Sequence, residues 1–285
     1  MKKKIAFVTD STAYLPQELR AHPDVYVVPI VVISEDKEYE DGIDLSSDQL
    51  YEMIRNNKEV PKTSQPSVGK FQKLYEDLKQ DYDQAIAIHV SSKLSGTYAS
   101  SMSGKDQADF NVEVIDSLSI SYAITALINK GLELVNLSED VNVKVIADQL
   151  RDEITKSKNF ILVGHLEQLY KGGRMSGVQF LLGNVLQIKP ILSINAEGEL
   201  GMLERIRSEK KAISKIIELL KQTNQENGLK KIEIMHGNVE EKASQLEQVI
   251  KKSVPNVDIV IGEISSSLAV HAGEGTLAVF CQTIE

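Results

Sequence analysis

The sequence is poor in cysteine and in aromatic residues, and this scarcity removes several classes of protein. Cys281 is the only cysteine, so the chain cannot form an internal disulfide or a thiolate zinc cluster. There is no tryptophan, and only 6 Phe and 9 Tyr supply rings on which bases could stack. A reducing cytoplasm is therefore the expected compartment.

Long apolar runs and an excess of positive charge are also missing. No apolar run approaches the ~20 residues that span a bilayer, so we expect any membrane contact to be transient and peripheral. With 32 Lys and Arg against 41 Asp and Glu, the formal charge is −9, which argues against nucleic acid as a partner. The apolar stretch after the N-terminal lysines ends at Thr9, which is too early for a signal peptide.

The usual motifs for nucleotides and metals are absent as well. The sequence has no Gly-x-x-x-x-Gly-Lys-Ser/Thr loop, no Gly-x-Gly-x-x-Gly turn and no His-Glu-x-x-His pair. Its five histidines lie far apart, without the spacing of metal ligands. We therefore expect neither a cofactor nor a metal site.

What is present is an ordinary globular composition, with 42% hydrophobic and 26% charged residues over 285 positions. Short β-branched runs alternate with segments of helical periodicity, which predicts an α/β fold with largely parallel sheets. We expect strands at 5–8, 25–33, 85–90, 112–115, 160–163, 232–235, 259–264 and 276–280, and helices at 48–55, 68–79, 98–107, 122–135, 143–156, 177–187, 209–222 and 239–252.

One interval departs from this alternation. Between residues 189 and 208, two strand-like runs flank a polar turn that contains Gly198, which predicts a β-hairpin. The polar stretch 157–159 is the best candidate for a domain boundary. We therefore expect an N-terminal α/β domain at 1–158 and a C-terminal α/β domain at 159–285 that carries the hairpin insertion.

Hydroxyl and glycine residues gather where predicted strands end, and ligands of open α/β sheets bind at such ends. Asp10 follows the first strand, and we expect it to orient other groups or to form a local turn. Pro61 and Pro66 hold Thr63 and Ser64 in an extended segment. That segment suits either a plain structural loop or a site for a small anion.

Ser95, Gly96 and Thr97 carry the strongest physical argument. They precede a predicted helix, where unpaired amides and the positive end of the helix dipole favour a carboxylate or a phosphate. Gly96 allows a ligand to approach the backbone closely. The alternative is an ordinary helix cap.

Basic side chains and one histidine complete the candidates. Arg174 follows paired glycines and is expected on the surface, while alternation would place Arg205 and Arg207 on one strand face. His271 stands near two glycines in an expected loop between strands. An imidazole that titrates near neutrality could donate a hydrogen bond to an oxyanion there.

These segments together resemble the DegV family, whose members include the acyl-binding subunits of bacterial fatty acid kinase. The similarity spans nearly the whole chain, in order, at residues 8–12, 62–67, 95–97, 172–176, 206–212 and 271–275. Glu274 departs from the pattern, since a neutral residue is expected in its place.

The resemblance implies a two-domain lipid-binding carrier rather than an enzyme. It would bury one long-chain fatty acid, such as palmitate, stearate or oleate, in an apolar tunnel. A separate ATP-dependent kinase subunit would convert the carboxylate to an acyl phosphate for phospholipid synthesis. By the family pattern, the carboxylate would be bound by Thr63, Ser95, Gly96 and His271, the phosphorylated head group by Arg207, and the kinase by Arg174.

The energetics of an acyl chain agree with this picture. Each CH₂ group that leaves water contributes about 0.8 kcal/mol, so the tail would supply most of the binding energy and the polar cluster would set orientation. Two other functions remain open. One is a serine hydrolase with Ser95 as nucleophile and His271 as base, although Ser95 is not in a Gly-x-Ser-x-Gly motif. The other is a regulatory protein that responds to fatty acid.

Overall fold

The computed structural model describes residues 4–56, 60–138, 142–174 and 188–284, and it confirms the expected α/β class. The chain forms two compact units. The first contains Met1–Ser46, Pro61–Ile154 and Ser265–Ser267, and the second contains Ser47–Val60, Thr155–Ile264 and Leu268–Glu285. The domain limits 1–158 and 159–285 stay a prediction. The helix expected at 177–187 lies outside the described residues.

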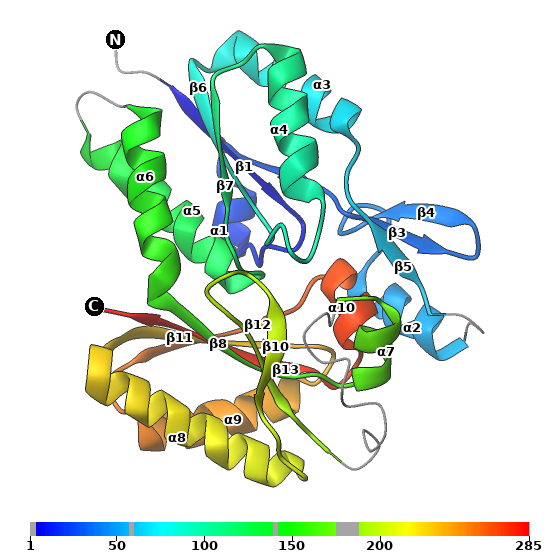
Figure 1. The fold of residues 1–285 in the computed structure, drawn as a ribbon, viewed down its shortest axis with the longest axis vertical. Coiled ribbons are helices and arrows are strands. Elements are labelled where there is room, and N and C mark those ends of the chain that lie inside the picture. The colour runs from blue at the N-terminus through cyan, green and yellow to red at the C-terminus, as the bar shows by residue number, and fades with distance from the viewer. Residues whose placement is uncertain (1–3, 57–59, 139–141, 175–187, 285) are drawn as a thin grey trace. The chain divides into compact units, whose positions relative to one another are not determined.

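The first unit is built on a parallel sheet with helices on both faces (Figure 1). Its strand order is β2-β1-β6-β7, with bounds Val25–Val28, Ile5–Asp10, Gln84–His89 and Val112–Asp116. Because both faces are covered, these strands are nearly continuous apolar runs. One face packs on α3 (Val68–Asp81) and α4 (Thr97–Ala108), and the other on α1 (Gln17–Arg20), α5 (Tyr122–Leu137) and α6 (Val143–Glu153).

A small antiparallel sheet also belongs to the first unit. Its order is β4-β3-β5, with bounds Lys37–Glu40, Val31–Ser34 and Lys62–Ser64. The single strand expected at 25–33 is interrupted at Pro29, which has no N–H to donate to a ladder. Its second half pairs instead with the extended segment after Pro61, where Thr63 lies opposite Val32.

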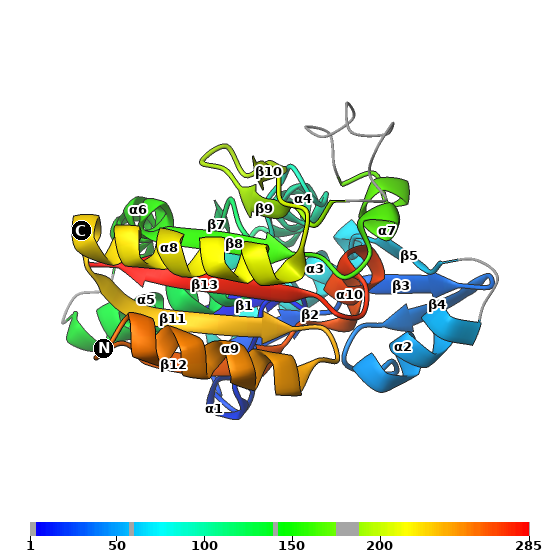
Figure 2. The same cartoon turned by 90° about the horizontal axis from the view of Figure 1, so that it is seen from below.

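The second unit contains a sheet of six strands. The order is β10-β9-β8-β13-β11-β12, with bounds Leu200–Glu204, Ile191–Ile194, Ser157–Leu162, Leu277–Thr283, Leu229–His236 and Asp258–Glu263. Only β11 and β12 are parallel neighbours, so this sheet is mixed rather than largely parallel. The predicted hairpin is confirmed as β9 and β10. Helices α8 (Glu209–Asn227) and α9 (Glu240–Ser253) pack on one face of the sheet (Figure 2).

Three shorter helices are α2 (Ser47–Asn56), α7 (Leu166–Lys171) and α10 (Ser266–Ala272). The last replaces the strand-linking loop that the sequence led us to expect. Its first amides, those of Ser266 and Ser267, each donate to the carboxylate of Asp41 at 3.1 Å. Since this cap comes from a distant part of the chain, the local sequence gave no sign of it. Among the described helices, none is long and apolar enough to cross a membrane.

Candidate functional site

The start of α4 is a polar corner of the first unit. The hydroxyls of Ser95 and Thr97 lie 2.8 Å apart, and the Thr97 N–H donates to Ser95 Oγ at 3.3 Å. Gly96 is the N-cap residue and has no side chain to satisfy the first amides of the helix. The sequence thus placed the helix start correctly, and the corner presents backbone N–H groups beside a hydroxyl pair.

Gln65 completes this corner, although the sequence did not single it out. Its amide lies so close to Gly96 that a Cβ atom added there would overlap Gln65 Oε1. Gln65 Nε2 also donates to Ser100 Oγ at 3.3 Å, on the first turn of α4. A side chain at position 96 would therefore have to displace the flexible end of Gln65 from the start of α4.

Thr63 lies on the same extended segment as Gln65. It lies on β5, half-buried, two residues before Gln65. Side chains two residues apart in an extended segment point to the same side. The structure thus brings the segment of Thr63 onto the start of α4, where Ser95 and Gly96 lie.

Asp10 supports this unit from inside, as expected. It is fully buried, and its carboxylate accepts hydrogen bonds from the N–H groups of Val90 at 2.9 Å and Thr12 at 3.0 Å, and from the Thr12 hydroxyl at 2.5 Å. His89 Nδ1 lies 3.1 Å from the same carboxylate. These donors occupy Asp10, so it is not a ligand for an external group.

His271 belongs to the second unit, on α10, and is more enclosed than the sequence suggested. Its ring lies against Gly172, where an added Cβ atom would overlap Nδ1. Burial lowers the pKa of His271 to about 4, and the positive charge of Arg174 lowers it further. The expectation that His271 titrates near neutrality is therefore wrong. At pH 7 it is a neutral imidazole.

Arg174 is half-buried rather than exposed on the surface. Its Nη1 donates to the carbonyl of Gly172, and burial lowers the pKa of the guanidinium. Arg205 and Arg207 are exposed, but β10 ends at Glu204, so they follow the strand instead of sharing a strand face. Of these three cations, Arg174 is the one whose charge acts on His271.

Glu274, where the resemblance led us to expect a neutral residue, has its own partners in the second unit. Its carboxylate accepts from Arg55 Nη1 at 3.0 and 3.1 Å and from Asn238 Nδ2 at 2.6 Å. Arg55 lies on α2, which therefore contacts the loop after His271. The negative charge introduced by Glu274 is compensated locally.

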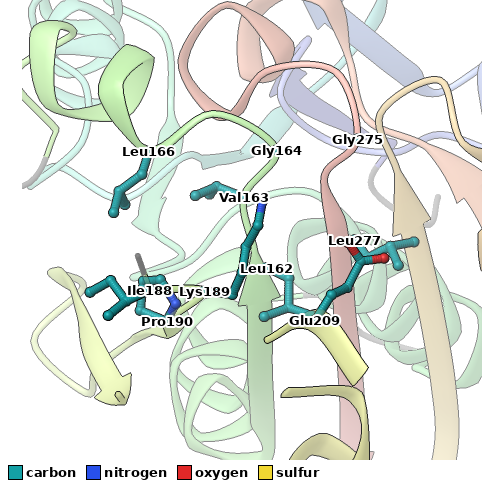
Figure 3. A pocket seen from close by; sticks show the side chains of 10 residues that line it. All are labelled: Leu162, Val163, Gly164, Leu166, Ile188, Lys189, Pro190, Glu209, Gly275 and Leu277. Carbon is teal, nitrogen blue, oxygen red and sulfur yellow. The ribbon is translucent and has the colours of Figure 1, made fainter. Parts of the chain in front are cut away.

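A pocket of about 460 Å³, part of it open to solvent, lies beside this loop in the second unit (Figure 3). Most of its lining side chains are apolar, but polar atoms share its exposed wall about equally, and Lys189 and Glu209 add one charge of each sign. At its edge, Gly164 N–H donates to Thr276 Oγ1 at 2.9 Å, and an added Cβ atom at Gly164 would overlap the carbonyl of Glu274. The lining residues are Leu162, Val163, Gly164, Leu166, Ile188, Lys189, Pro190, Glu209, Gly275 and Leu277.

The described residues contain no group of three or more His, Cys, Asp or Glu arranged to hold a metal ion. The chemistry available at these sites is therefore that of hydroxyls, backbone amides, a neutral imidazole and guanidinium groups. Such donors suit an anionic oxygen group, and an apolar pocket suits a hydrocarbon.

Comparison with known proteins agrees with this chemistry. The model of the DegV family, described as a family of uncharacterised proteins, matches residues 4–283. The chain belongs to the DegV family. A DegV domain-containing protein of Caldanaerobacter subterraneus subsp. tengcongensis is 32% identical over 279 residues, which are 98% of this chain and 98% of the relative.

Two solved structures of DegV proteins resemble the fold closely. One is a fatty acid binding DegV family protein from Streptococcus agalactiae, with a TM-score of 0.91 and 32% identity, covering 99% of this chain and 100% of that chain. The other is DegV from Bacillus subtilis, described as a fatty acid binding protein, with a TM-score of 0.89, 32% identity and the same coverage.

Proposed function

We propose that this DegV protein binds one long-chain fatty acid and presents its carboxylate to a separate ATP-dependent kinase subunit. The observation that carries the proposal is the start of α4, where Gly96 caps the helix without a side chain and Ser95 lies beside it. Two relatives of the same fold are described as fatty acid binding proteins, which supports an acyl ligand.

In this proposal, the carboxylate accepts hydrogen bonds from Thr63, Ser95 and the amide of Gly96. His271 is a further donor, and its neutral imidazole can donate without adding a charge. The apolar tail supplies most of the affinity, at about 0.8 kcal/mol per buried CH₂ group.

The kinase step follows from the chemistry of a presented carboxylate. A carboxylate oxygen attacks the γ-phosphorus of ATP, the bond to the bridging oxygen breaks, and ADP leaves. The product is an acyl phosphate, which this protein carries away for phospholipid synthesis. Arg207, exposed after β10, is proposed to steady the phosphorylated head group, and Arg174 to meet the kinase.

Uptake of ligand tests the first half of the proposal. Delipidated protein mixed with palmitate or oleate should gain the mass of one fatty acid in native mass spectrometry. Ser95→Ala should weaken binding roughly 10- to 100-fold, because a hydrogen bond to a charged group contributes about 1.5–3 kcal/mol.

The matched control is Ser92→Ala, on the same loop. Ser92 is exposed, and its backbone N–H rather than its hydroxyl bonds to Asp116. This variant should bind as tightly as the wild type. Failure of the wild-type protein to take up either fatty acid would end the proposal. Covalent labelling of Ser95 by a fluorophosphonate would favour the hydrolase instead.

A further inference from the structure

Four buried side chains of the first unit form a continuous chain of hydrogen bonds. His89 Nδ1 lies 3.1 Å from Asp10 Oδ2, and His89 Nε2 lies 2.9 Å from Ser101 Oγ. Ser101 Oγ in turn lies 2.6 Å from the hydroxyl of Tyr75. All four residues have an exposed fraction of 0%. They come from β1, β6, α4 and α3, so the chain crosses from the sheet to both helices on one of its faces.

The direction of the hydrogen bond between His89 and Asp10 follows from what each group can donate. A carboxylate only accepts, so His89 Nδ1–H donates to Asp10. His89 Nε2 is bonded to the Ser101 hydroxyl, which is bonded in turn to the hydroxyl of Tyr75. Burial raises the pKa of Tyr75, which keeps its hydroxyl protonated. In this arrangement every proton shared among the four side chains has an acceptor.

The order Asp, His, Ser matches that of a hydrolytic triad, but these residues cannot do that chemistry here. Ser101 is fully buried, and its hydroxyl is already bonded to that of Tyr75. A nucleophile must reach its substrate, so Ser101 is not one. The chain of hydrogen bonds instead fixes the parts of the structure that it joins.

The part most dependent on it is α4. The buried face of this helix consists of small residues, Thr97, Ser100, Ser101, Gly104 and Ala108, and offers little apolar surface. The larger side chains of α4, Tyr98 and Met102, are only partly buried where they pack against the core, so the hydrogen bonds of Ser101 add to what sets the depth and rotation of the helix. Ser101 lies one turn after Thr97, so its bonds to His89 and Tyr75 hold α4 directly after its first turn.

We propose that Tyr75, Ser101 and His89 are positioning residues for the carboxylate corner at Ser95 and Gly96. They act through α4, by holding its first turn where the amide of Gly96 points at the ligand. This inference rests on the proposed function, because the corner is a carboxylate site only if the protein binds fatty acid.

The test compares two tyrosine hydroxyls. Tyr75→Phe removes the end of the chain, whereas Tyr82→Phe removes a hydroxyl that bonds to Asp24 at 2.8 Å and has no bond to α4. Both proteins are labelled with ¹⁵N-glycine and loaded with palmitate carrying ¹³C at its carboxyl carbon. Tyr75→Phe should shift the Gly96 amide signal and the bound carboxyl signal, and weaken palmitate binding about fivefold. Tyr82→Phe should leave all three as in the wild type.

Ser101→Ala is the second variant and should reproduce the effects of Tyr75→Phe. If both variants lose stability but keep wild-type Gly96 and carboxyl signals, the role is only structural and the inference is overturned. If the wild type takes up no palmitate, the proposed function fails. The Gly96 amide signal of the ligand-free protein then still tests whether the four hydrogen-bonded residues position α4. An unshifted Gly96 signal in both variants would overturn this positioning role as well.

Discussion

At the scale of single residues, His271 shows how enclosure changes the chemistry of a side chain. Its ring lies against Gly172, and burial together with the charge of Arg174 lowers its pKa to about 4. A histidine near glycines in a sequence carries no sign of such enclosure. The imidazole that the sequence led us to expect to titrate near neutrality is a neutral donor at pH 7, because its pKa is lowered to about 4.

This lowered pKa gives a prediction about acid stability. Between pH 6.5 and 4 the unfolded chain binds a proton at residue 271 that the folded chain does not. The free energy of unfolding should therefore fall as the pH falls through this window, by at most about 1.4 kcal/mol per pH unit from this group. His271→Gln should flatten the slope, as measured by urea denaturation at pH 7.5, 6 and 5.

Part of the slope should remain in that variant. Burial also lowers the pKa of His236, which contributes with the same sign. A slope in His271→Gln as steep as in the wild type would show that His271 is not held neutral.

The sequence was sufficient for some site residues because their signal is local. Ser95 and Gly96 could be found from the rules of helix starts, and Asp10 from its place at the end of a strand. Gln65 could not, since its position over Gly96 depends on how two separate segments fold. The same holds for the pairing of Glu274 with Arg55, since the two residues are 219 positions apart.

At the scale of elements, α3 and α4 pack closely at Gly104. A Cβ atom added there would lie 2.5 Å from Phe71 Cβ and 2.9 Å from the backbone N of Gln72. Neither neighbour is the flexible end of a side chain. The two helices can approach this closely only because position 104 has no side chain.

Two glycine substitutions test this packing. Gly104→Ala should lower the free energy of unfolding by about 1–3 kcal/mol, because the helices must move apart. Gly69→Ala, in α3, is the control, since its Cβ atom would meet nothing nearer than Ser67 Oγ at 4.0 Å. It should be neutral or stabilise by up to about 1 kcal/mol. Equal effects of the two substitutions in thermal unfolding would rule out close packing at Gly104.

Periodicity predicted most helices and strands of the described residues, but not which strands pair. The runs at β8, β11 and β13 look like those of the parallel sheet in sequence, yet β13 pairs antiparallel with both β8 and β11. Strand direction depends on the connections between elements, which alternation of apolar residues does not encode. The strand expected at 25–33 missed the break at Pro29, and the extended segment between Pro61 and Pro66 did not indicate that β5 would join β3.

At the scale of the whole molecule, the charge of −9 makes clusters of cations unusual. Arg205, Arg207, Lys210 and Lys211 are exposed between β10 and the first turn of α8. An acidic protein that presents such a group can attract an anionic substrate or partner locally while repelling polyanions elsewhere. This agrees with the proposed phosphoryl transfer.

The proposed kinase contact can be tested by charge reversal. Arg174→Glu should reduce ATP-dependent formation of acyl phosphate with the kinase subunit at least tenfold, while uptake of palmitate stays within about twofold of the wild type. Lys171→Glu makes the same change of charge on an exposed residue that pairs with Glu167. It should couple normally. Loss of palmitate binding together with coupling in Arg174→Glu would count against a contact with the kinase.

The hydrogen bonds of Asp41 to the start of α10 can form only after a distant part of the chain has been synthesised. The Asp41 carboxylate bonds to the amide of Ser266, 225 residues later in the chain. At roughly 5–20 residues per second, a ribosome needs about 10–45 s to make the residues between them. During that time the Asp41 carboxylate lacks the amide donors of Ser266 and Ser267 and must remain hydrated. The first unit, although it begins at the N-terminus, is completed only when the last tenth of the chain emerges.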